Sequence, residues 1–272
     1  MRLADKVAII SGGGTGIGAA TARLFAEEGA SVVVTGRRQE PLQAVATEIG
    51  GVAVAGNVSD PEHVRTAVDA AVDRFGGLDI VVANAGAGYG GAIADLTDEE
   101  WSKTIDVNLT GAFTLTRAAL PHLIDRGGGS IVLVSSIAGL GSFPEEAAYS
   151  TTKAAMLGLA RSIAADYGRY GVRANTLCPG WVRTPMGDRA MDWLAGLRGV
   201  DREAAYRIAT AATPLRRPAE AAEIASCCLF LASDESSFVT GSVLVADGGN
   251  RAVDVASQVF DEHGEDAPGQ RA

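Results

Sequence analysis

The chain has 272 residues, of which 47% are hydrophobic, and it carries a formal net charge of -10. This length and apolar content are enough for one large α/β domain or for two smaller domains. The acidic balance argues against a nucleic-acid partner, because binding to phosphate backbones needs a basic face. No apolar run approaches the roughly 18 residues of a membrane span, so we expect a cytoplasmic protein with no membrane partner.

The cysteine and histidine residues are few and scattered. They are Cys178, Cys227, Cys228, His63, His122 and His263. The cysteines form no evident disulfide framework, which fits a reducing compartment. The histidines do not stand at metal-ligand spacing with a cysteine or a carboxylate, so no metal site is predicted.

Short β-branched runs alternate along the chain with longer amphipathic stretches. The runs expected as strands are residues 7–10, 31–35, 52–55, 80–83, 130–134, 172–177 and 242–245. The stretches expected as helices include residues 18–28, 61–75, 99–124, 149–167 and 219–231. Strands that are apolar on both faces are typical of a parallel sheet covered by helices. We therefore predict one Rossmann-like doubly wound α/β domain over residues 1–250, with a seven-stranded, mainly parallel sheet and helices on both faces.

Two segments interrupt this alternation. Residues 185–213 contain Met186, Trp193 and Leu197 among several arginines and show no strand pattern, so we expect a lid over a substrate site. Trp193 could equally pack in a small core of the lid itself. Residues 251–272 form an acidic C-terminal extension that is too polar to pack alone and is expected to be partly mobile.

A glycine-rich loop, SGGGTGIG at residues 11–18, joins the first expected strand to a helical pattern. Its spacing is Gly12-x-x-x-Gly16-x-Gly18. Glycines in such a loop let the backbone approach a pyrophosphate, which then lies at the helix N-terminus. An ordinary strand-to-helix turn is the alternative, but the strand before the loop and the helix after it favour dinucleotide binding.

The end of the second expected strand indicates which dinucleotide is bound. An acidic residue there would bind the adenosine ribose hydroxyls, but this chain has Gly36 followed by Arg37 and Arg38. The two arginines could bind a 2'-phosphate through charge-assisted hydrogen bonds, or could simply be solvated. NADP(H) is therefore favoured, with NAD(H) as the alternative.

Tyr149 and Lys153 stand four residues apart in AAYSTTKAAM, at the start of an expected helix. Residues at this spacing share a helix face, so the lysine charge could lower the pKa of the tyrosine. A free tyrosine titrates near ~10, and half ionisation at neutral pH needs about 4 kcal/mol of stabilisation. The pair is either an acid/base group with its activator or two neighbouring side chains on one turn.

Together with four further motifs, these features make the chain resemble the short-chain dehydrogenase/reductase family from about residue 4 to residue 249. The matching stretches are the glycine loop, ANAG at 83–86, DVNLTG around Asn108, VSSIAG around Ser136, the pair Tyr149 and Lys153, and the Pro-Gly turn at 179–180 with Val182 and Thr184 beyond it. Any one of these matches could be chance, but their shared order and spacing are highly specific.

The resemblance implies an NAD(P)-dependent oxidoreductase that interconverts a secondary alcohol and a ketone or aldehyde by hydride transfer. Tyr149 would act as the general acid/base, Ser136 would hydrogen-bond the substrate oxygen, and Lys153 would also hold the nicotinamide ribose. Asn108 would anchor a water molecule that relays protons through Lys153. Taken alone, Ser136 and Asn108 are better explained by hydrogen bonds at a strand end and a helix kink.

The motifs and the resemblance together define an expected set of cofactor contacts. These are Gly12, Gly14, Thr15, Gly16, Ile17, Gly18, Arg37, Arg38, Asn57, Val58, Asn84, Ala85, Gly86, Tyr149, Lys153, Pro179, Gly180, Val182 and Thr184. Asn57 replaces the aspartate of many relatives and can still accept from the adenine amino group. Thr15 stands where many NADP-dependent members carry a basic residue, which weakens the preference for NADP(H).

The expected partner is a small carbonyl or alcohol substrate that contacts Ser136 and Tyr149. Its walls would come from residues 87–91, 137–143, Trp181 and the lid. A 3-oxoacyl thioester, a sugar or polyol, and a steroid or xenobiotic carbonyl all stay open. Tyr170 stands where the carrier-protein-dependent reductases of the family use arginine, although Arg169 and Arg173 are close in sequence.

The resemblance also implies a homotetramer, or a homodimer, with helices 99–124 and 149–167 at an interface. A catalytically silent dinucleotide-binding sensor on the same fold is the alternative function. Loss of Tyr149 or Lys153 would mark such a protein, and this chain keeps both.

Overall fold

Seven parallel strands form the central sheet of the computed structural model, which describes residues 1–88 and 90–254. Their order is β3-β2-β1-β4-β5-β6-β9. The strands are β1 (Val7–Ser11), β2 (Ser31–Gly36), β3 (Val52–Ala55), β4 (Ile80–Ala83), β5 (Gly129–Val134), β6 (Val172–Pro179) and β9 (Val243–Ala246). The predicted seven-stranded doubly wound sheet is confirmed. The strand order reverses beside β1, so a crevice forms at the carboxyl ends of β1 and β4.

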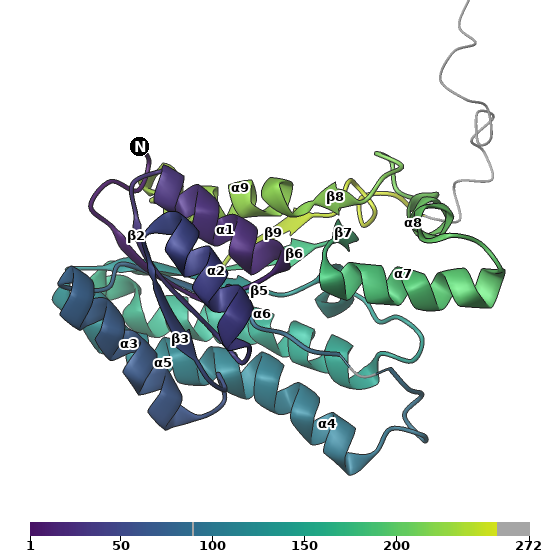
Figure 1. The fold of residues 1–272 in the computed structure, drawn as a ribbon, viewed down its shortest axis with the longest axis horizontal. Coiled ribbons are helices and arrows are strands. Elements are labelled where there is room, and N and C mark those ends of the chain that lie inside the picture. Colours follow the sequence, from purple (N-terminus) through teal and green to yellow (C-terminus); the bar gives the residue numbers. More distant parts are fainter. Residues whose placement is uncertain (89, 255–272) are drawn as a thin grey trace, which may run out of the picture.

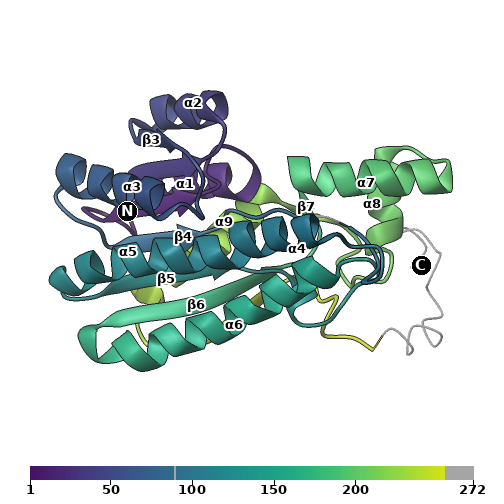
Figure 2. The ribbon, with the colours of Figure 1, turned by 90° about the horizontal axis from the view of Figure 1, so that it is seen from below.

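Seven helices cover the two faces of this sheet (Figures 1 and 2). They are α1 (Gly16–Glu27), α2 (Gln39–Ile49), α3 (Pro61–Phe75), α4 (Asp98–Ile105), α5 (Gly111–Asp125), α6 (Ala147–Tyr167) and α9 (Ala221–Ala232). Helix α2 lies outside the five stretches expected from the sequence. Its single proline, Pro41, lies in the first turn, where a missing N–H is tolerated.

Alternate residues of each strand point to opposite faces and build two separate cores. Ile10, Val34 and Val82 pack with α1, α2 and α9, whereas Ile9 and Val81 pack with α3, α5 and α6. The period of two in a strand explains this division, because successive side chains leave the sheet on opposite sides. Both faces are apolar, as the unbroken hydrophobic runs predicted.

The stretch expected as one helix over residues 99–124 is helical throughout, but a π-helical turn interrupts the regular α-helix in its middle. Helix α4 ends at Ile105, a wide π-helical turn occupies Asp106–Thr110, and α5 begins at Gly111. A β-carbon at Gly111 would lie 2.6 Å from Cγ1 of Val58, so the turn needs glycine at this approach. The interruption places Asn108 in the wide turn, where its buried side chain faces neighbouring elements.

Residues 185–213 form a helical unit that consists mainly of α7 (Pro185–Arg198) and α8 (Arg202–Thr210). The unit lies beyond the carboxyl ends of the strands (Figures 1 and 2). Thr184 caps α7, Pro185 begins it, and Gly199 ends it with φ +66°. Two short strands, β7 (Val182–Arg183) and β8 (Ala219–Glu220), pair in parallel at its base.

This α7–α8 unit has its own small core around Met191, Ala195, Ala205 and Tyr206. The side chain of Trp193 is 64% exposed and does not belong to that core, so the interpretation of Trp193 as a packing residue of the unit is wrong. The role of the unit as a substrate lid stays a prediction.

Two further expectations concern membranes and the C-terminal extension. Within residues 1–88 and 90–254, no helix is long and apolar enough to cross a membrane. Residues 255–272 of the expected extension lie outside the described residues.

Candidate active site

A cavity of about 510 Å³ opens at the carboxyl ends of the strands, beside the switch in strand order. Fifteen of the predicted site residues line it, namely Gly12, Gly14, Thr15, Gly16, Ile17, Arg37, Arg38, Asn57, Val58, Asn84, Ala85, Gly86, Tyr149, Lys153 and Thr184. Other predicted residues, Gly18, Asn108, Ser136, Pro179, Gly180 and Val182, are not on its wall. Segments far apart in sequence therefore meet at one cavity.

Several wall residues are not among the predicted site residues. They are Gly36, Pro41, Leu42, Gly56, Val107, Val134, Ser135, Pro185 and Met186. Pro185 and Met186 belong to the predicted lid, and some of the others are next to a predicted residue. Nothing in the chemistry of Pro41 and Leu42 distinguishes them from core residues.

The glycines of the loop are required by close packing as well as by backbone conformation. A β-carbon at Gly12 would lie 2.9 Å from Nδ2 of Asn84, and one at Gly18 would lie 2.6 Å from the same atom. Gly16 has φ +56°, and its β-carbon would lie 3.1 Å from Cγ2 of Thr184. The loop is thus pressed between β4 and the start of α7.

The N-terminus of α1 fits an anionic ligand. Thr15 occupies the N-cap position but makes no side-chain capping hydrogen bond, so the first amides of the helix keep their donors for another partner. Such amides and the helix dipole bind phosphate groups. These donors and the open glycine loop fit the pyrophosphate of a dinucleotide.

Ser11, which the sequence reasoning missed, fixes the loop to β4. Its hydroxyl oxygen accepts hydrogen bonds from the backbone amides of Asn84 and Ala85, each at 3.0 Å. The side-chain amide of Asn84 in turn donates to the carbonyl of Ser11 at 3.0 Å. These contacts hold the predicted residues Asn84 and Ala85 at the cavity wall.

The wall of the cavity is positively charged although the whole chain is acidic. Among the described residues that line it, the charged side chains are Arg37, Arg38 and Lys153, with no carboxylate. Arg38 donates to the hydroxyl of Thr15 at 3.2 Å, and Arg37 is exposed beside it. The electrostatics therefore favour a ligand with several negative charges.

Lys153 is a buried ammonium group that makes no ion pair with a carboxylate of the described residues. Its side chain is 3% exposed, and Nζ donates to the carbonyl of Val134 at 2.8 Å and lies 3.9 Å from Sδ of Met156. Burial lowers the pKa of Lys153 to about 8. Donors on Nζ beyond those used by Val134 and Met156 are available to a ligand in the cavity.

Tyr149 lies on the same face of α6 as Lys153, with Nζ 5.5 Å from the centroid of its ring. The pKa of Tyr149 is raised to about 12, mainly by burial and also by the carboxylate of Glu146, whereas a hydrogen bond with Ser136 opposes this change. The expected lowering of the tyrosine pKa by Lys153 is therefore not found in the protein alone. At neutral pH this hydroxyl is a proton donor.

Ser136 is partly exposed and lies at the start of a short turn that follows β5. Its hydroxyl accepts from the amide of Ala138 at 3.1 Å and also faces Tyr149. The structure thus brings Ser136 and Tyr149 together although 13 positions separate them in the sequence. A substrate oxygen placed between these two hydroxyls could receive two hydrogen bonds.

Asn108 connects the loop after β4 to α6. Its Oδ1 accepts from the amide of Ala87 at 2.8 Å, and its Nδ2 donates to the carbonyl of Ala87 at 2.8 Å and to the hydroxyl of Thr152 at 3.0 Å. These bonds use both amide hydrogens and leave one acceptor position on Oδ1. The water relay that the resemblance implies stays a prediction.

No group of three or more histidine, cysteine or carboxylate side chains in the described part of the chain could hold a metal ion. The described cysteines are free thiols, and burial raises the pKa of Cys228 to about 12.

Comparisons with known proteins agree with this geometry. A family model described as enoyl-(acyl carrier protein) reductase matches residues 12–251. The chain is 43% identical to protein MoaE of Klebsiella aerogenes over 94% of this chain and 99% of that protein. It is 41% identical to trans-4-hydroxycyclohexanecarboxylate dehydrogenase of Sinomonas cyclohexanicum over 92% of this chain and 95% of that enzyme.

A solved structure described as a short chain dehydrogenase/reductase family protein is similar over the whole fold. Its TM-score is 0.81 at 37% sequence identity, and the alignment covers 93% of this chain and 100% of that chain. The fold of this chain is therefore shared with that structure.

Proposed function

The chain belongs to the short-chain dehydrogenase/reductase family, and on this premise we propose that it interconverts a secondary alcohol and a ketone or aldehyde with a nicotinamide dinucleotide. Membership makes the protein an oxidoreductase that acts on a small molecule. The observation that carries the finer proposal is the position of Tyr149 and Lys153 together on the wall of a positively charged cavity, with Ser136 within hydrogen-bond reach of Tyr149.

The residues of the chain would divide the work of this reaction. A bound nicotinamide would supply or accept the hydride. The glycine loop would hold the pyrophosphate, Lys153 would bind a ribose hydroxyl, and Thr184 would close the cavity from the start of α7. Tyr149 would give its proton to the carbonyl oxygen or remove it from the alcohol, and Ser136 would hydrogen-bond the same oxygen.

The state of Tyr149 supports its use as an acid in the reducing direction. With a pKa raised to about 12, the hydroxyl keeps its proton at neutral pH and can donate it. In the oxidising direction the hydroxyl has to lose this proton, and the positive charges of Lys153 and of an oxidised cofactor would stabilise the phenolate.

Replacement of Tyr149 by phenylalanine tests the proposal. We expect Tyr149→Phe to lower kcat by about a hundredfold or more, because the proton-transferring group is lost. Binding of the cofactor, measured by calorimetry, should be nearly unchanged. Tyr167→Phe, at the other end of α6, is the matched control and should keep wild-type turnover. Turnover of Tyr149→Phe close to wild type would refute the role.

We infer a preference for NADP(H) over NAD(H) from Arg37 and Arg38, with no carboxylate on the described wall to bind free ribose hydroxyls. Arg37→Ala and Arg38→Ala should each raise KM for NADPH by about tenfold and change KM for NADH much less, since a charge-assisted bond to phosphate is lost. Steady-state kinetics with both cofactors measures this. An equal effect on the two cofactors would contradict a phosphate site.

The substrate class is part of the proposal, with 3-oxoacyl thioesters, sugars or polyols, and steroid or xenobiotic carbonyls as the candidates. Arg173 does not take the place of the arginine that Tyr170 replaces. Its guanidinium donates to the hydroxyl of Ser236 at 2.8 Å and to three backbone carbonyls at the end of α9 and in the loop after it. This disfavours a carrier-protein contact through Arg173.

We also propose a homotetramer, or a homodimer, in which α4, α5 and α6 contribute to an interface. Phe113 on α5 is 44% exposed and Trp101 on α4 is 39% exposed, so both could contribute apolar area to such an interface. A monomeric mass in light scattering would contradict the assembly. A cytoplasmic location stays a prediction from the sequence.

A further inference from the structure

Within the described residues, the carboxylate of Glu146 makes no hydrogen bond or ion pair, and it lies next to the proposed reacting centre. Glu146 directly precedes α6 and is three residues before Tyr149. Its side chain is partly buried, and burial raises the pKa of this carboxyl group. The carboxylate oxygens are not among the fully buried polar atoms that lack a partner, so a donor group of a ligand can reach them.

The loop after β4 shows on which side of Tyr149 this carboxylate lies. A β-carbon at Gly86 would lie 3.6 Å from Nζ of Lys153, and one at Gly88 would lie 3.2 Å from Cδ2 of Tyr149. Gly91 then forms a parallel bridge with Glu146. The loop thus passes Lys153, Tyr149 and Glu146 in that order.

Glu146 therefore lies beyond Tyr149 as seen from Lys153. Tyr149 and Lys153 line the cofactor cavity, and Glu146 does not. The side of Tyr149 that faces away from the cofactor is where the rest of a substrate has to extend. The carboxylate is also close enough to influence the tyrosine hydroxyl, because its negative charge raises the pKa of Tyr149.

We propose that Glu146 determines substrate specificity, by accepting a hydrogen bond from a hydroxyl or ammonium group that the substrate carries beside its reacting carbon. The same charge disfavours a substrate with a carboxylate at this place, since two like charges would share a poorly solvated site. This inference rests on the proposed alcohol and ketone chemistry and narrows its substrate class to donor-bearing carbonyl compounds.

The test compares four ketones that differ in one group. They are 2-butanone, hydroxyacetone, aminoacetone and acetoacetate, which place a methyl, a hydroxyl, an ammonium or a carboxylate on the same carbon next to the carbonyl. The quantity measured is kcat/KM for each, relative to 2-butanone, with the reduced cofactor. The wild-type enzyme should prefer hydroxyacetone and aminoacetone and should use acetoacetate least.

Two variants of Glu146 and one matched control decide the role of the charge. Glu146→Gln, which keeps the size of the side chain, should reduce the ratio of aminoacetone to acetoacetate by about tenfold or more. Glu146→Lys should invert the preference in favour of acetoacetate. Glu145→Gln removes the exposed neighbouring charge and should leave the ratio within about twofold, because exposed charges are well screened.

The outcomes separate this inference from the proposed function. Reduction of 2-butanone with the same ketone preference in wild type and Glu146→Gln would overturn the inference and leave the proposed function intact. An equal change of the ratio in Glu145→Gln would also overturn it, because the effect would then be a general one. A wild-type enzyme that reduces none of the four ketones, with either cofactor, would overturn the inference, and it would count against the proposed function only if sugars, steroids and 3-oxoacyl thioesters also failed.

Discussion

The reacting centre and the α7–α8 unit are held in place by different kinds of contact. In the centre, Lys153 is bound by the carbonyl of Val134 and Asn108 by the backbone of Ala87, at distances of 2.8 Å and with little exposure. These contacts fix the side chains through the backbone of rigid strands and helices. Lys153 carries the charge of this centre. No carboxylate of the described residues pairs with it, so the ammonium group is available to a ligand.

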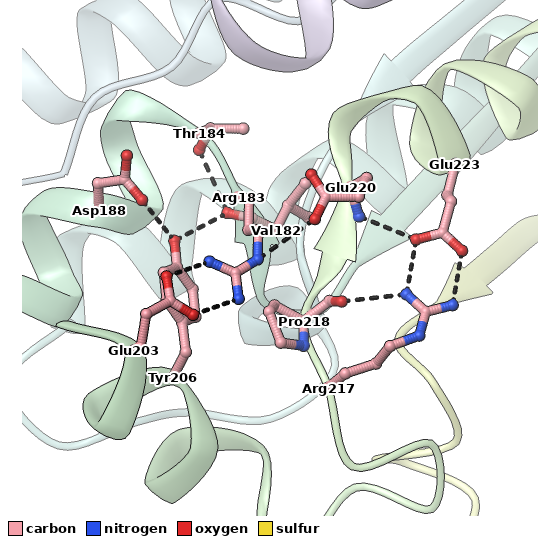
Figure 3. A network of polar contacts seen from close by, with 10 residues as sticks. All are labelled: Val182, Arg183, Thr184, Asp188, Glu203, Tyr206, Arg217, Pro218, Glu220 and Glu223. Carbon is pink, nitrogen blue, oxygen red and sulfur yellow. Dashed lines mark hydrogen bonds and ion pairs between the residues drawn. The ribbon is translucent and has the colours of Figure 1, made fainter.

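The α7–α8 unit is instead joined to the body by an ion-pair network near the surface, centred on Arg183 (Figure 3). Arg183 donates to both carboxylate oxygens of Glu203, at 2.6 and 2.7 Å, and pairs with Glu220 at 3.2 Å. Its guanidinium also lies 4.8 Å from the ring centroid of Tyr206, whose hydroxyl donates to Asp188 at 2.9 Å. One arginine thus contacts β8 and α8 at once.

From this difference we expect the reacting centre to carry out the chemistry and the α7–α8 unit to control access to the cavity. Buried backbone contacts preserve the geometry of Tyr149, Lys153 and Asn108, whereas each exposed ion pair stabilises the fold only slightly and is weakened by salt. A unit held by such pairs can shift at a small cost in free energy. We therefore expect changes in the centre to alter kcat and changes in the network to alter KM.

The largest effect is expected for Lys153→Met, which removes the buried charge and keeps a similar volume. We predict that kcat falls by about a hundredfold or more, while the thermal midpoint stays at or above that of wild type. Thermal unfolding and steady-state kinetics measure the two effects. Lys103→Met, at an exposed pair with Glu99, is the control and should change neither. A large drop in the midpoint would instead assign Lys153 a mainly structural role.

The free energy of unfolding should depend on pH because of the buried charge of Lys153. Folded Lys153 loses its proton near pH 8, whereas its ordinary pKa is 10.5, so between these values the unfolded chain binds more protons. Raising the pH through this window therefore stabilises wild type relative to Lys153→Met. Urea unfolding of both proteins at about pH 7 and about pH 10 measures the change. If the difference in free energy of unfolding between wild type and Lys153→Met stayed constant with pH, it would contradict a buried ammonium group at Lys153.

A smaller effect is expected when the ion-pair network is broken. Arg183→Ala should raise KM for the cofactor by about threefold with less change in kcat, because Arg183 directly precedes the start of α7 that packs on Gly16. The effect should shrink at high salt. Arg23→Ala breaks a comparable exposed pair with Glu48, between α1 and α2, and should leave KM unchanged. If Arg183→Ala lowered kcat and left KM unchanged, the network would not act on access to the cavity as we expect.

The smallest effect is expected at the surface of the α7–α8 unit. Trp193→Ala should change the free energy of unfolding by less than about 0.5 kcal/mol, because most of its side chain is already in water. Met191→Ala, in the core of the same helix, should cost about 2 to 5 kcal/mol. Chemical denaturation of the two variants compares them. Equal losses would show that Trp193 is buried by a contact outside the described chain.

Local sequence patterns were sufficient for the sheet, and together with the family resemblance they identified most of the cofactor cavity. The apolar strands, the glycine loop and the helix face shared by Tyr149 and Lys153 follow from backbone periodicity, which acts over a few residues. The bounds of α3 were predicted to the residue, because Asp60 caps it, Pro61 begins it and Gly76 ends it in the left-handed conformation. Such signals do not depend on the rest of the chain.

Only the tertiary structure decided the features that depend on contacts between distant segments. The wide turn at Asn108 arises where Gly111 meets Val58, and the two-residue strands β7 and β8 are too short to leave a pattern. The raised pKa of Tyr149 and the place of Glu146 beside it depend on burial by the loop after β4. By itself, the sequence determined which groups could carry out the chemistry. The fold decided which of them lie without a partner, because desolvation depends on every element packed around a charge.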